Sequence, residues 1–257
     1  MEIVDNTRTF REVDGKLEFY RNTLILKKED VFYYAFTYIR RQLIRKIKID
    51  ELDVHPIPID TICPPFSLDL TLAPDPLPQD CYIKGPRYIE YKPDAPVGRR
   101  PCDHLMKEIR ICEILKEHPH PNIAQYMGCT VHNNRINGLI FTKYHTTLAD
   151  RFGDQHRPLH PAVYLEGIES GLKHLHGLGL IHNDINPRNI MLRNDDTPVI
   201  IDFDSCQHEG EKCMSAGTKG WSLEDMRFSV AQNDYYGLRK IQEALENGRM
   251  PEEPKPW

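Results

Sequence analysis

The sequence predicts an α+β fold with two lobes, in which strands precede helices. Residues 81–92 read CYIKGPRYIEYK, two short strand-like runs across a Gly-Pro turn. Apolar residues recur at spacings of three and four over residues 103–117, with Asp103 as the expected N-cap, which predicts an amphipathic helix. A second stripe of this kind covers residues 162–178 and leads into a loop rich in Asp and Asn. The residues of this second stripe are Val163, Ile168, Leu172 and Leu175.

Residues 1–53 are an N-terminal extension for which the sequence predicts no definite fold. Short apolar runs alternate there with charges and then with the aromatic run 31–39. A basic stretch follows, with Arg40, Arg41, Arg45, Lys46 and Lys48. We interpret it as the solvated face of a helix beside an aromatic core face, with contact to a membrane or nucleic acid as the less favoured alternative.

Residues 54–79 form a proline-rich segment, with seven prolines between Pro56 and Pro78. Proline removes backbone donors and blocks the continuation of a helix. This segment is therefore expected to be an extended strap or linker.

The most informative stretch is IHNDINPRNIML, residues 181–192, followed by IIDFD, residues 200–204. Asp184 and Asn189 lie five residues apart in the loop, and Asp202 and Asp204 end the next strand-like run. Mg²⁺ prefers such oxygen ligands and keeps its other bonds for water and nucleotide phosphates. These residues predict magnesium and phosphate chemistry.

The two motifs together resemble those of protein-kinase-like domains. Their residues are most similar to the motifs of divergent kinase-like proteins of filamentous fungi. The loop H-R-D-x-x-x-x-N of that family is matched by His182, Asn183, Asp184 and Asn189, and its D-F-G by Asp202, Phe203 and Asp204. The resemblance implies ATP and Mg²⁺ as cofactors, with Asp184 as the catalytic base and Asn189 and Asp202 as metal ligands.

A kinase also pairs a lysine with a glutamate of its regulatory helix in order to hold the α- and β-phosphates. Glu108 is the expected glutamate, because apolar residues follow it as in the family pattern. Lys84 is the preferred lysine, since it follows Tyr82 and Ile83 in a context similar to V-A-I-K. Lys92 is the alternative, because it precedes Glu108 by the more usual sixteen residues instead of twenty-four.

The same resemblance implies an adenine pocket and supports for the catalytic loop. Phe141 would guard the back of the pocket, Thr142 and Tyr144 would offer backbone groups at the hinge, and Met191 would lie beneath the ring. Below the loop, His182 is expected to pack against Phe203 and Asp234 to anchor the loop, while Thr218 is expected to help bind Asp184. The implied domains are an N-lobe at residues 80–145, a C-lobe at 146–246 and a polar tail at 247–257.

Three departures from the family pattern modify the expected fold. No G-x-G-x-x-G precedes Lys84, so a reduced N-lobe without a glycine-rich loop is expected. Asn183 replaces the arginine that pairs with an activation-loop phosphate, so regulation by that route is not expected. Twenty residues follow Gly237, so a truncated helical C-lobe is expected.

The resulting functional expectation is ATP- and Mg²⁺-dependent phosphoryl transfer, to Ser or Thr of an unidentified protein substrate. Two alternatives stay open. One is a small-molecule phosphotransferase similar to aminoglycoside and choline kinases, which Asp204 and the missing glycine loop favour. The other is a pseudokinase that acts as a binding scaffold.

Composition narrows partners and location. A net charge of −5 and a pI near 6.2 give no electrostatic reason to expect nucleic-acid binding. The seven cysteines contain no C-x-x-C pair and are interpreted as reduced thiols inside a cell. The N-terminus lacks the apolar core of a signal peptide and no run suffices for a membrane span, so a cytoplasmic or nuclear location is expected. No pattern indicates an oligomeric state.

Overall fold

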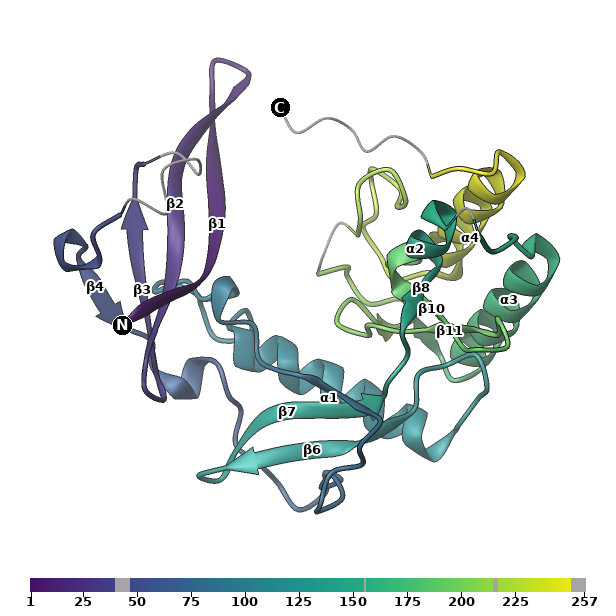
Figure 1. Ribbon diagram of the computed structural model, residues 1–257, viewed down its shortest axis with the longest axis horizontal. Helices are drawn as coiled ribbons and strands as arrows, with labels where there is room; N and C mark the ends of the chain where they lie inside the picture. Colours follow the sequence, from purple (N-terminus) through teal and green to yellow (C-terminus); the bar gives the residue numbers. More distant parts are fainter. Residues whose placement is uncertain (40–46, 155, 215–216, 251–257) are drawn as a thin grey trace.

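The computed structural model describes the whole chain except residues 40–46, 155, 215–216 and 251–257. The basic stretch therefore lies outside the described residues, apart from Lys48, which forms an exposed ion pair with Glu51. Figure 1 shows an N-terminal sheet on one side, a small sheet with helix α1 in the middle, and a helical part on the other side.

The N-terminal sheet is antiparallel, with its four strands in the order of the chain. They are β1 (Glu2–Val13), β2 (Lys16–Lys28), β3 (Val31–Thr37) and β4 (Val54–Pro56). A 3-10 turn at Ile49–Glu51 lies between β3 and β4. The aromatic run is thus a strand, and its interpretation as one face of a helix was wrong. The run VFYYAFT is rich in aromatic residues, which pack well on the pleated surface of a sheet.

Both faces of this sheet bury apolar side chains. Leu24, Leu26 and Ala35 are fully buried on one face, beneath partly buried residues of the segment 47–54. On the other face Ile25 packs with residues of the strap, and Phe32 stacks on Tyr88 with ring centroids 3.7 Å apart. This second contact joins the sheet to the segment that carries Lys84.

The proline-rich strap begins with β4 in the N-terminal sheet, and the remainder follows an irregular course with a 3-10 turn at Ile59–Thr61 and runs along the small sheet. Leu72 forms a parallel bridge with Cys129, and Pro65 forms an antiparallel one with Arg135. Gly128 allows the close approach, because a Cβ there would lie 2.6 Å from the backbone of Leu72 and Ala73.

The small sheet has the strand order β5-β7-β6 and packs against α1. Its elements are β5 (Cys81–Lys84), β6 (Tyr126–His132), β7 (Arg135–Thr142) and α1 (Pro101–Glu117). The second predicted strand after Gly85 was wrong: residues Tyr88–Glu90 form a 3-10 turn, held by the contact of Tyr88 with the N-terminal sheet.

Helix α1 begins two residues earlier than predicted, since Pro101 occupies its first turn. Asp103 is therefore not the N-cap. It lies in the first turn, where its carboxylate accepts the backbone N–H groups of Gly98 and Arg100 at 2.8 and 2.9 Å. The buried face of α1 includes Leu105, Glu108 and Cys112.

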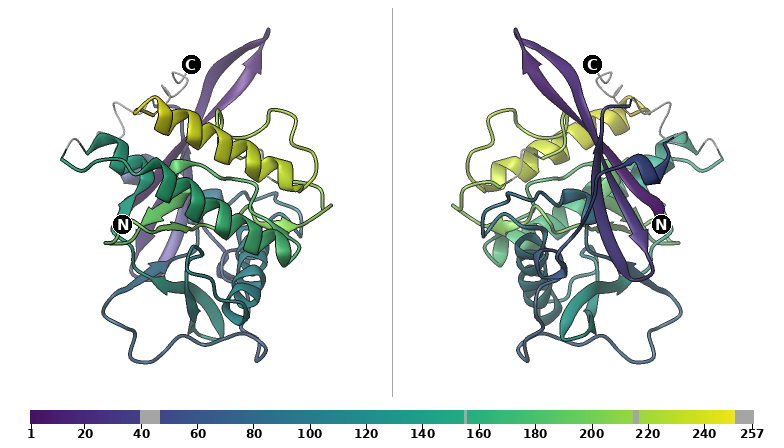
Figure 2. Two further views of the ribbon diagram at one scale, coloured as in Figure 1. Left: turned by 90° about the vertical axis from the view of Figure 1, so that its right-hand side faces the viewer. Right: turned by 90° about the vertical axis from the view of Figure 1, so that its left-hand side faces the viewer.

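The helical part consists of three helices and short strands. These are β8 (Thr146–Thr147), α2 (Leu148–Gly153), α3 (Pro161–Gly177), β9 (Leu180–Ile181), β10 (Ile190–Leu192), β11 (Pro198–Ile200), β12 (Gln207–His208) and α4 (Ala231–Glu246), with a 3-10 turn at Pro187–Asn189. Figure 2 shows α3 and α4 side by side. Strands β8, β10 and β11 form one sheet and β9 pairs with β12, so the predicted loop lies between two short sheets.

The predicted stripe of α3 needs one correction. Val163 is 48% exposed, whereas its neighbour Tyr164 is fully buried with Ile168, Leu172 and Leu175. Positions 164, 168, 171 and 175 follow one another at the three- and four-residue intervals of a helix face, and a stripe that starts at position 163 fits these intervals less well. One continuous core joins α1, the small sheet and α3. None of the described helices is both long and apolar enough to cross a bilayer.

Candidate active site

A cavity of about 300 Å³ lies where the small sheet, α1 and the loop after β11 meet. All four residues predicted for an adenine pocket line it, together with three predicted phosphate and metal residues. The lining comprises Tyr82, Lys84, Glu108, Ala124, Phe141, Thr142, Tyr144, Met191, Ile201 and Asp202. Seven side chains that the sequence predicted for the site therefore lie around one cavity.

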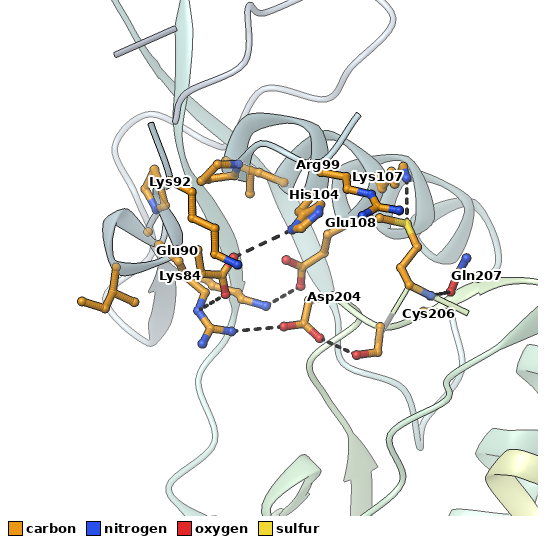
Figure 3. A pocket seen from close by; sticks show the side chains of 18 of the residues that line it. Lys84, Glu90, Lys92, Arg99, His104, Lys107, Glu108, Asp204, Cys206 and Gln207 are labelled. Carbon is orange, nitrogen blue, oxygen red and sulfur yellow. Dashed lines mark hydrogen bonds and ion pairs between the residues drawn. The ribbon is translucent and has the colours of Figure 1, made fainter. Parts of the chain in front are cut away.

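Lys84, at the end of β5, binds two carboxylates. Its Nζ lies 2.6 Å from Glu108 Oε1 and 2.5 Å from Asp202 Oδ1. Lys92, the alternative lysine, forms no such pair within the described chain and lines a neighbouring cavity instead. Figure 3 shows Lys84 pointing to Glu108, with Lys92 to one side.

Burial and charge oppose each other in this triad. Burial raises the pKa of Glu108 above its ordinary value of 4.5, although the Lys84 ammonium acts in the other direction. For Asp202, burial is outweighed by the charge and the hydrogen bond of Lys84, which together lower its pKa. Burial likewise opposes the charge on Lys84, but the two carboxylates raise its pKa. Lys84 is therefore a charged ammonium group in a site that is largely shielded from solvent.

Asp184 is held by one residue of its own loop and by one residue of the later segment that carries Thr218. Thr218 N–H donates to Asp184 Oδ1 at 2.8 Å, and Asn189 Nδ2 donates to Asp184 Oδ2 at 3.0 Å. Asn189 Nδ2 also donates to the Asp184 carbonyl at 2.9 Å. The contact from Thr218 agrees with the expectation from the sequence. Asp184 and Asn189 do not line the 300 Å³ cavity.

The loop is anchored from below by Asp234 of α4, as the sequence predicted. This fully buried carboxylate accepts the backbone N–H groups of His182 and Asn183 at 2.9 and 2.7 Å, and it contacts His176 Nε2 at 2.8 Å. Charge-assisted bonds of this kind are among the stronger ones in proteins. They fix the backbone on which Asp184 stands.

His182 packs against Phe203, as predicted, with ring centroids 5.8 Å apart in an edge-to-face arrangement. Its Nε2 lies 3.0 Å from the Ile201 carbonyl. Both rings are almost fully buried. This contact joins the Asp184 loop to the Asp202 loop.

Asn183, which stands where the family pattern has arginine, is buried within the protein. Its Nδ2 donates to Ser229 Oγ at 2.9 Å and to the Ser205 carbonyl at 3.1 Å, while its Oδ1 accepts from Asn233 Nδ2 at 2.9 Å. The backbone has φ +65°, a left-handed conformation that asparagine tolerates better than most residues. Asn183 thus stabilises the loop with neutral bonds instead of offering a cation to solvent.

The contact between Asp204 and Arg87 was not predicted from the sequence. Arg87 Nη1 lies 3.3 Å from Asp204 Oδ2, and its Nε lies 2.9 Å from Glu90. Figure 3 shows Asp204 below the pair of Lys84 and Glu108. The contact with Arg87 connects the segment after β5 to the loop of Asp202. The two residues are 117 positions apart, and no local pattern relates them.

The oxygen atoms around the loop fit a magnesium ion that is completed by other ligands. Within the described chain, Asn189 Oδ1 and Asp202 Oδ2 accept no hydrogen bond, because the other polar atoms of these side chains make the contacts given above. No group of three His, Cys, Asp or Glu side chains forms a metal cluster among the described residues. A site with few protein oxygens matches an ion that keeps waters and phosphates as ligands.

Comparison with known proteins gives the family. The model of the protein kinase domain matches residues 90–223, just over half of the chain. Glu108, Asp184, Asn189 and Asp202 lie inside this match, and Lys84 lies just before it.

Curated relatives agree with the domain match. The chain is 30% identical over 136 residues to the serine/threonine-protein kinase Tao of Drosophila melanogaster, covering 52% of this chain and 13% of Tao. It is 30% identical over 141 residues to the MAP kinase kinase kinase SSK2 of Saccharomyces cerevisiae, covering 51% and 8%. It is 28% identical over 148 residues to the human serine/threonine-protein kinase/endoribonuclease IRE2, covering 49% and 15%. The chain thus spans about a tenth of the length of these relatives.

Proposed function

The chain belongs to the protein kinase domain family, and we propose that it transfers the terminal phosphate of ATP to a Ser or Thr hydroxyl of a protein in a Mg²⁺-dependent reaction. One observation carries this proposal: Lys84 contacts both Glu108 and Asp202 at the wall of a cavity that the adenine-pocket residues also line. Serine/threonine kinases among the relatives favour this acceptor.

In this proposal Lys84 binds the nucleotide phosphates. Glu108 keeps the ammonium in place from α1, since it is 3% exposed and 2.6 Å from Nζ. The adenine ring of ATP is enclosed by Phe141, Thr142 and Met191. Because phosphoryl transfer depends chiefly on positioning and on neutralising charge, the prealigned lysine is worth more than a flexible surface lysine.

Asp184 is proposed to accept or orient the proton of the attacking hydroxyl. Its two oxygens are fixed by Thr218 and Asn189, so the carboxylate has one orientation. Asn189 and Asp202 would hold magnesium, which when bound supplies neutralisation of the phosphate charge.

The N-lobe is proposed to be a reduced one. No glycine-rich loop precedes Lys84, and β5 pairs with β7 alone in the described part of the chain. Backbone amides of a glycine loop would otherwise approach the phosphates. ATP is therefore expected to bind more weakly than it would with such a loop.

The proposal is tested by following labelled phosphate from ATP and Mg²⁺ into a mixture of Ser- and Thr-containing peptides, with a set of small alcohols in parallel. We expect labelled phosphopeptide, and its loss by about a hundredfold or more in Asp184→Asn, which keeps the side-chain shape but cannot act as a base. If labelled phosphate appeared in the small alcohols and not in the peptides, the acceptor would be a small molecule instead of a protein. No label in either would contradict phosphoryl transfer.

A catalytically weak scaffold is the second candidate, and the missing glycine loop is the observation that favours it. It predicts binding of Mg²⁺-ATP without transfer. Under this candidate Lys84→Met would abolish binding, whereas Asp184→Asn would leave binding and the absence of transfer unchanged.

A further inference from the structure

A groove of about 810 Å³ lies on the exposed side of α1, beside the candidate active site. Three segments surround it: the loop before α1, α1 itself and the segment that follows Asp202. We call it the basic groove and define it by six of its lining residues, Lys92, Arg99, His104, Lys107, His208 and Lys212. Figure 3 shows Lys92 on one side of His104 and both Arg99 and Lys107 on the other, and all four residues also line the adjoining cavity.

Three cations of the basic groove have no partner in the described chain, whereas His104 faces Glu90, with its Nδ1 3.9 Å from Glu90 Oε2. Lys92, Arg99 and Lys212 form no side-chain ion pair or hydrogen bond among the described residues, and the partner of Lys107 is the thioether of Met214 at 2.8 Å. By contrast Arg110, which also lines the groove, pairs with Asp69. Glu211 is the one acidic residue in the described lining of the groove.

This concentration of cations contrasts with the chain as a whole, whose net charge is −5. Like charges at close range repel each other, so four unpaired cations around one hollow favour the binding of an anion. The lysines of the groove are exposed and retain their donors, and Arg99 adds a planar fork that matches phosphate oxygens.

The wall after Asp202 is built before any ligand arrives. Gln207 Nε2 donates to the Lys212 carbonyl at 3.1 Å, and Gln207 Oε1 accepts from Met214 N–H at 3.1 Å. Lys212 also bridges to Phe228, and His208 lies in β12, which pairs with β9. These bonds hold His208 and Lys212 opposite α1, so little ordering is needed on binding.

We propose that the basic groove binds a small molecule that carries several phosphate groups. The cations surround a hollow instead of following a line along the surface, and its volume falls in the range of small-molecule sites. A single phosphate would meet only part of this set, whereas clustered phosphates engage cations from all three segments. An extended phosphorylated peptide fits this arrangement less well.

The groove shares Lys92, Arg99, His104 and Lys107 with a cavity that Lys84 and Glu108 also line. A ligand in the groove would therefore join α1, which carries Glu108, to the segment that follows Asp202. Binding is inferred from the groove alone and does not depend on phosphoryl transfer by the active site.

The test is calorimetric titration of the chain with inositol hexakisphosphate and with inorganic tripolyphosphate, without Mg²⁺. The chain used carries Lys84→Met, so that the nucleotide site does not contribute. We expect the double variant Lys92→Gln/Lys107→Gln to weaken binding of at least one probe by about tenfold or more, because two charge-assisted contacts are lost. Raising the ionic strength from about 0.05 to about 0.3 M should also weaken binding, since the Debye length shrinks.

The matched control is Lys28→Gln/Lys116→Gln, which removes the same charge from exposed positions outside the groove. It should leave the affinity within about twofold, since its lysines do not line the groove. Hydrogen exchange should slow in residues 104–111 and 207–214 when the probe is bound. Absence of binding by both probes, or equal losses in the two double variants, would overturn the proposal. Tighter binding of a doubly phosphorylated peptide than of either probe would overturn the small-molecule assignment.

Discussion

Both donors of Thr71, its backbone N–H and its hydroxyl, bind the carboxylate of Glu113, at 2.8 and 2.7 Å. Thr71 belongs to the proline-rich strap and Glu113 to α1. On its other side, the Thr71 carbonyl accepts the N–H of Cys129 in β6 at 2.9 Å. The strap therefore ties the helix that carries Glu108 to the small sheet.

Replacing Glu113 by Gln should destabilise the protein by about 1–2 kcal/mol, because one of two charge-assisted bonds becomes a contact between donors. The measurement is the free energy of unfolding in urea. Glu117→Gln, an exposed change on the same helix with no side-chain partner in the described chain, should change it by less than about 0.5 kcal/mol. Equal effects of the two changes would show that the strap does not hold α1.

Gly237 lets α4 approach the loop that carries Asp184. A Cβ at this position would lie 2.3 Å from the Ile185 carbonyl oxygen, so Gly237→Ala must displace the residue next to Asp184. We expect a loss of about 1–3 kcal/mol in unfolding free energy and a larger fractional loss of transfer activity. Gly177→Ala in α3 is the control, because open space surrounds it and alanine favours a helix. Similar stabilities for the two variants would contradict the close contact.

Asp234→Asn should be among the most damaging single changes. Asn presents an amide where the backbone N–H groups of His182 and Asn183 now meet a carboxylate. The expected loss is about 3 kcal/mol, the magnitude for breaking a buried charged network. Thermal unfolding measures it, with the exposed Asp225→Asn as control. A loss below about 1 kcal/mol for Asp234→Asn would mean that the anchor contributes little.

The pH dependence of nucleotide binding should follow the protonation of Glu108. Because burial raises its pKa above 4.5, Glu108 takes up a proton at a pH where ordinary glutamates are still ionised, and the pair with Lys84 then weakens. Asp202, whose pKa is lowered, stays ionised through that window.

The sign of the stability effect follows from the same shifts. The raised pKa of Glu108 means that its ionised form costs stability above that pKa, and this cost disappears as pH falls. The lowered pKa of Asp202 contributes stability above 3.8, which is lost as pH falls through the lowered value. Protonation of Glu108 should therefore lower the affinity for Mg²⁺-ATP as the pH falls from neutral towards the ordinary range of glutamate, and Glu108→Gln should bind weakly with no such slope. The same slope in Glu108→Gln would assign the titration to another group.

Much of the site could be predicted from the sequence because its chemistry is local. Asp184 and Asn189 lie within one loop, and Asp202 follows the end of β11 by two residues, so their spacing indicates their proximity. Lys84 and Glu108 could be paired only through the family resemblance, which left Lys92 open. Their direct contact became visible in the fold.

Other features depended on contacts that a sequence pattern does not encode. The exchange of Val163 for Tyr164 in the core of α3 was a one-residue error of phase, and the 3-10 turn at Tyr88–Glu90 follows from stacking on Phe32. Thr71 and Glu113 are 42 positions apart, and nothing near either residue indicates the other. At Tyr88–Glu90, tertiary contact overrode the local preference for a strand.

The central claim, that Lys84 belongs to a nucleotide site, is tested most directly by titrating the protein with Mg²⁺-ATP and following its thermal unfolding. A ligand that binds only the folded state raises apparent stability. The parent chain and Lys92→Met should both show a rise in melting temperature at millimolar nucleotide, whereas Lys84→Met should show almost none. No rise in the parent chain, or its loss in Lys92→Met but not in Lys84→Met, would contradict the account.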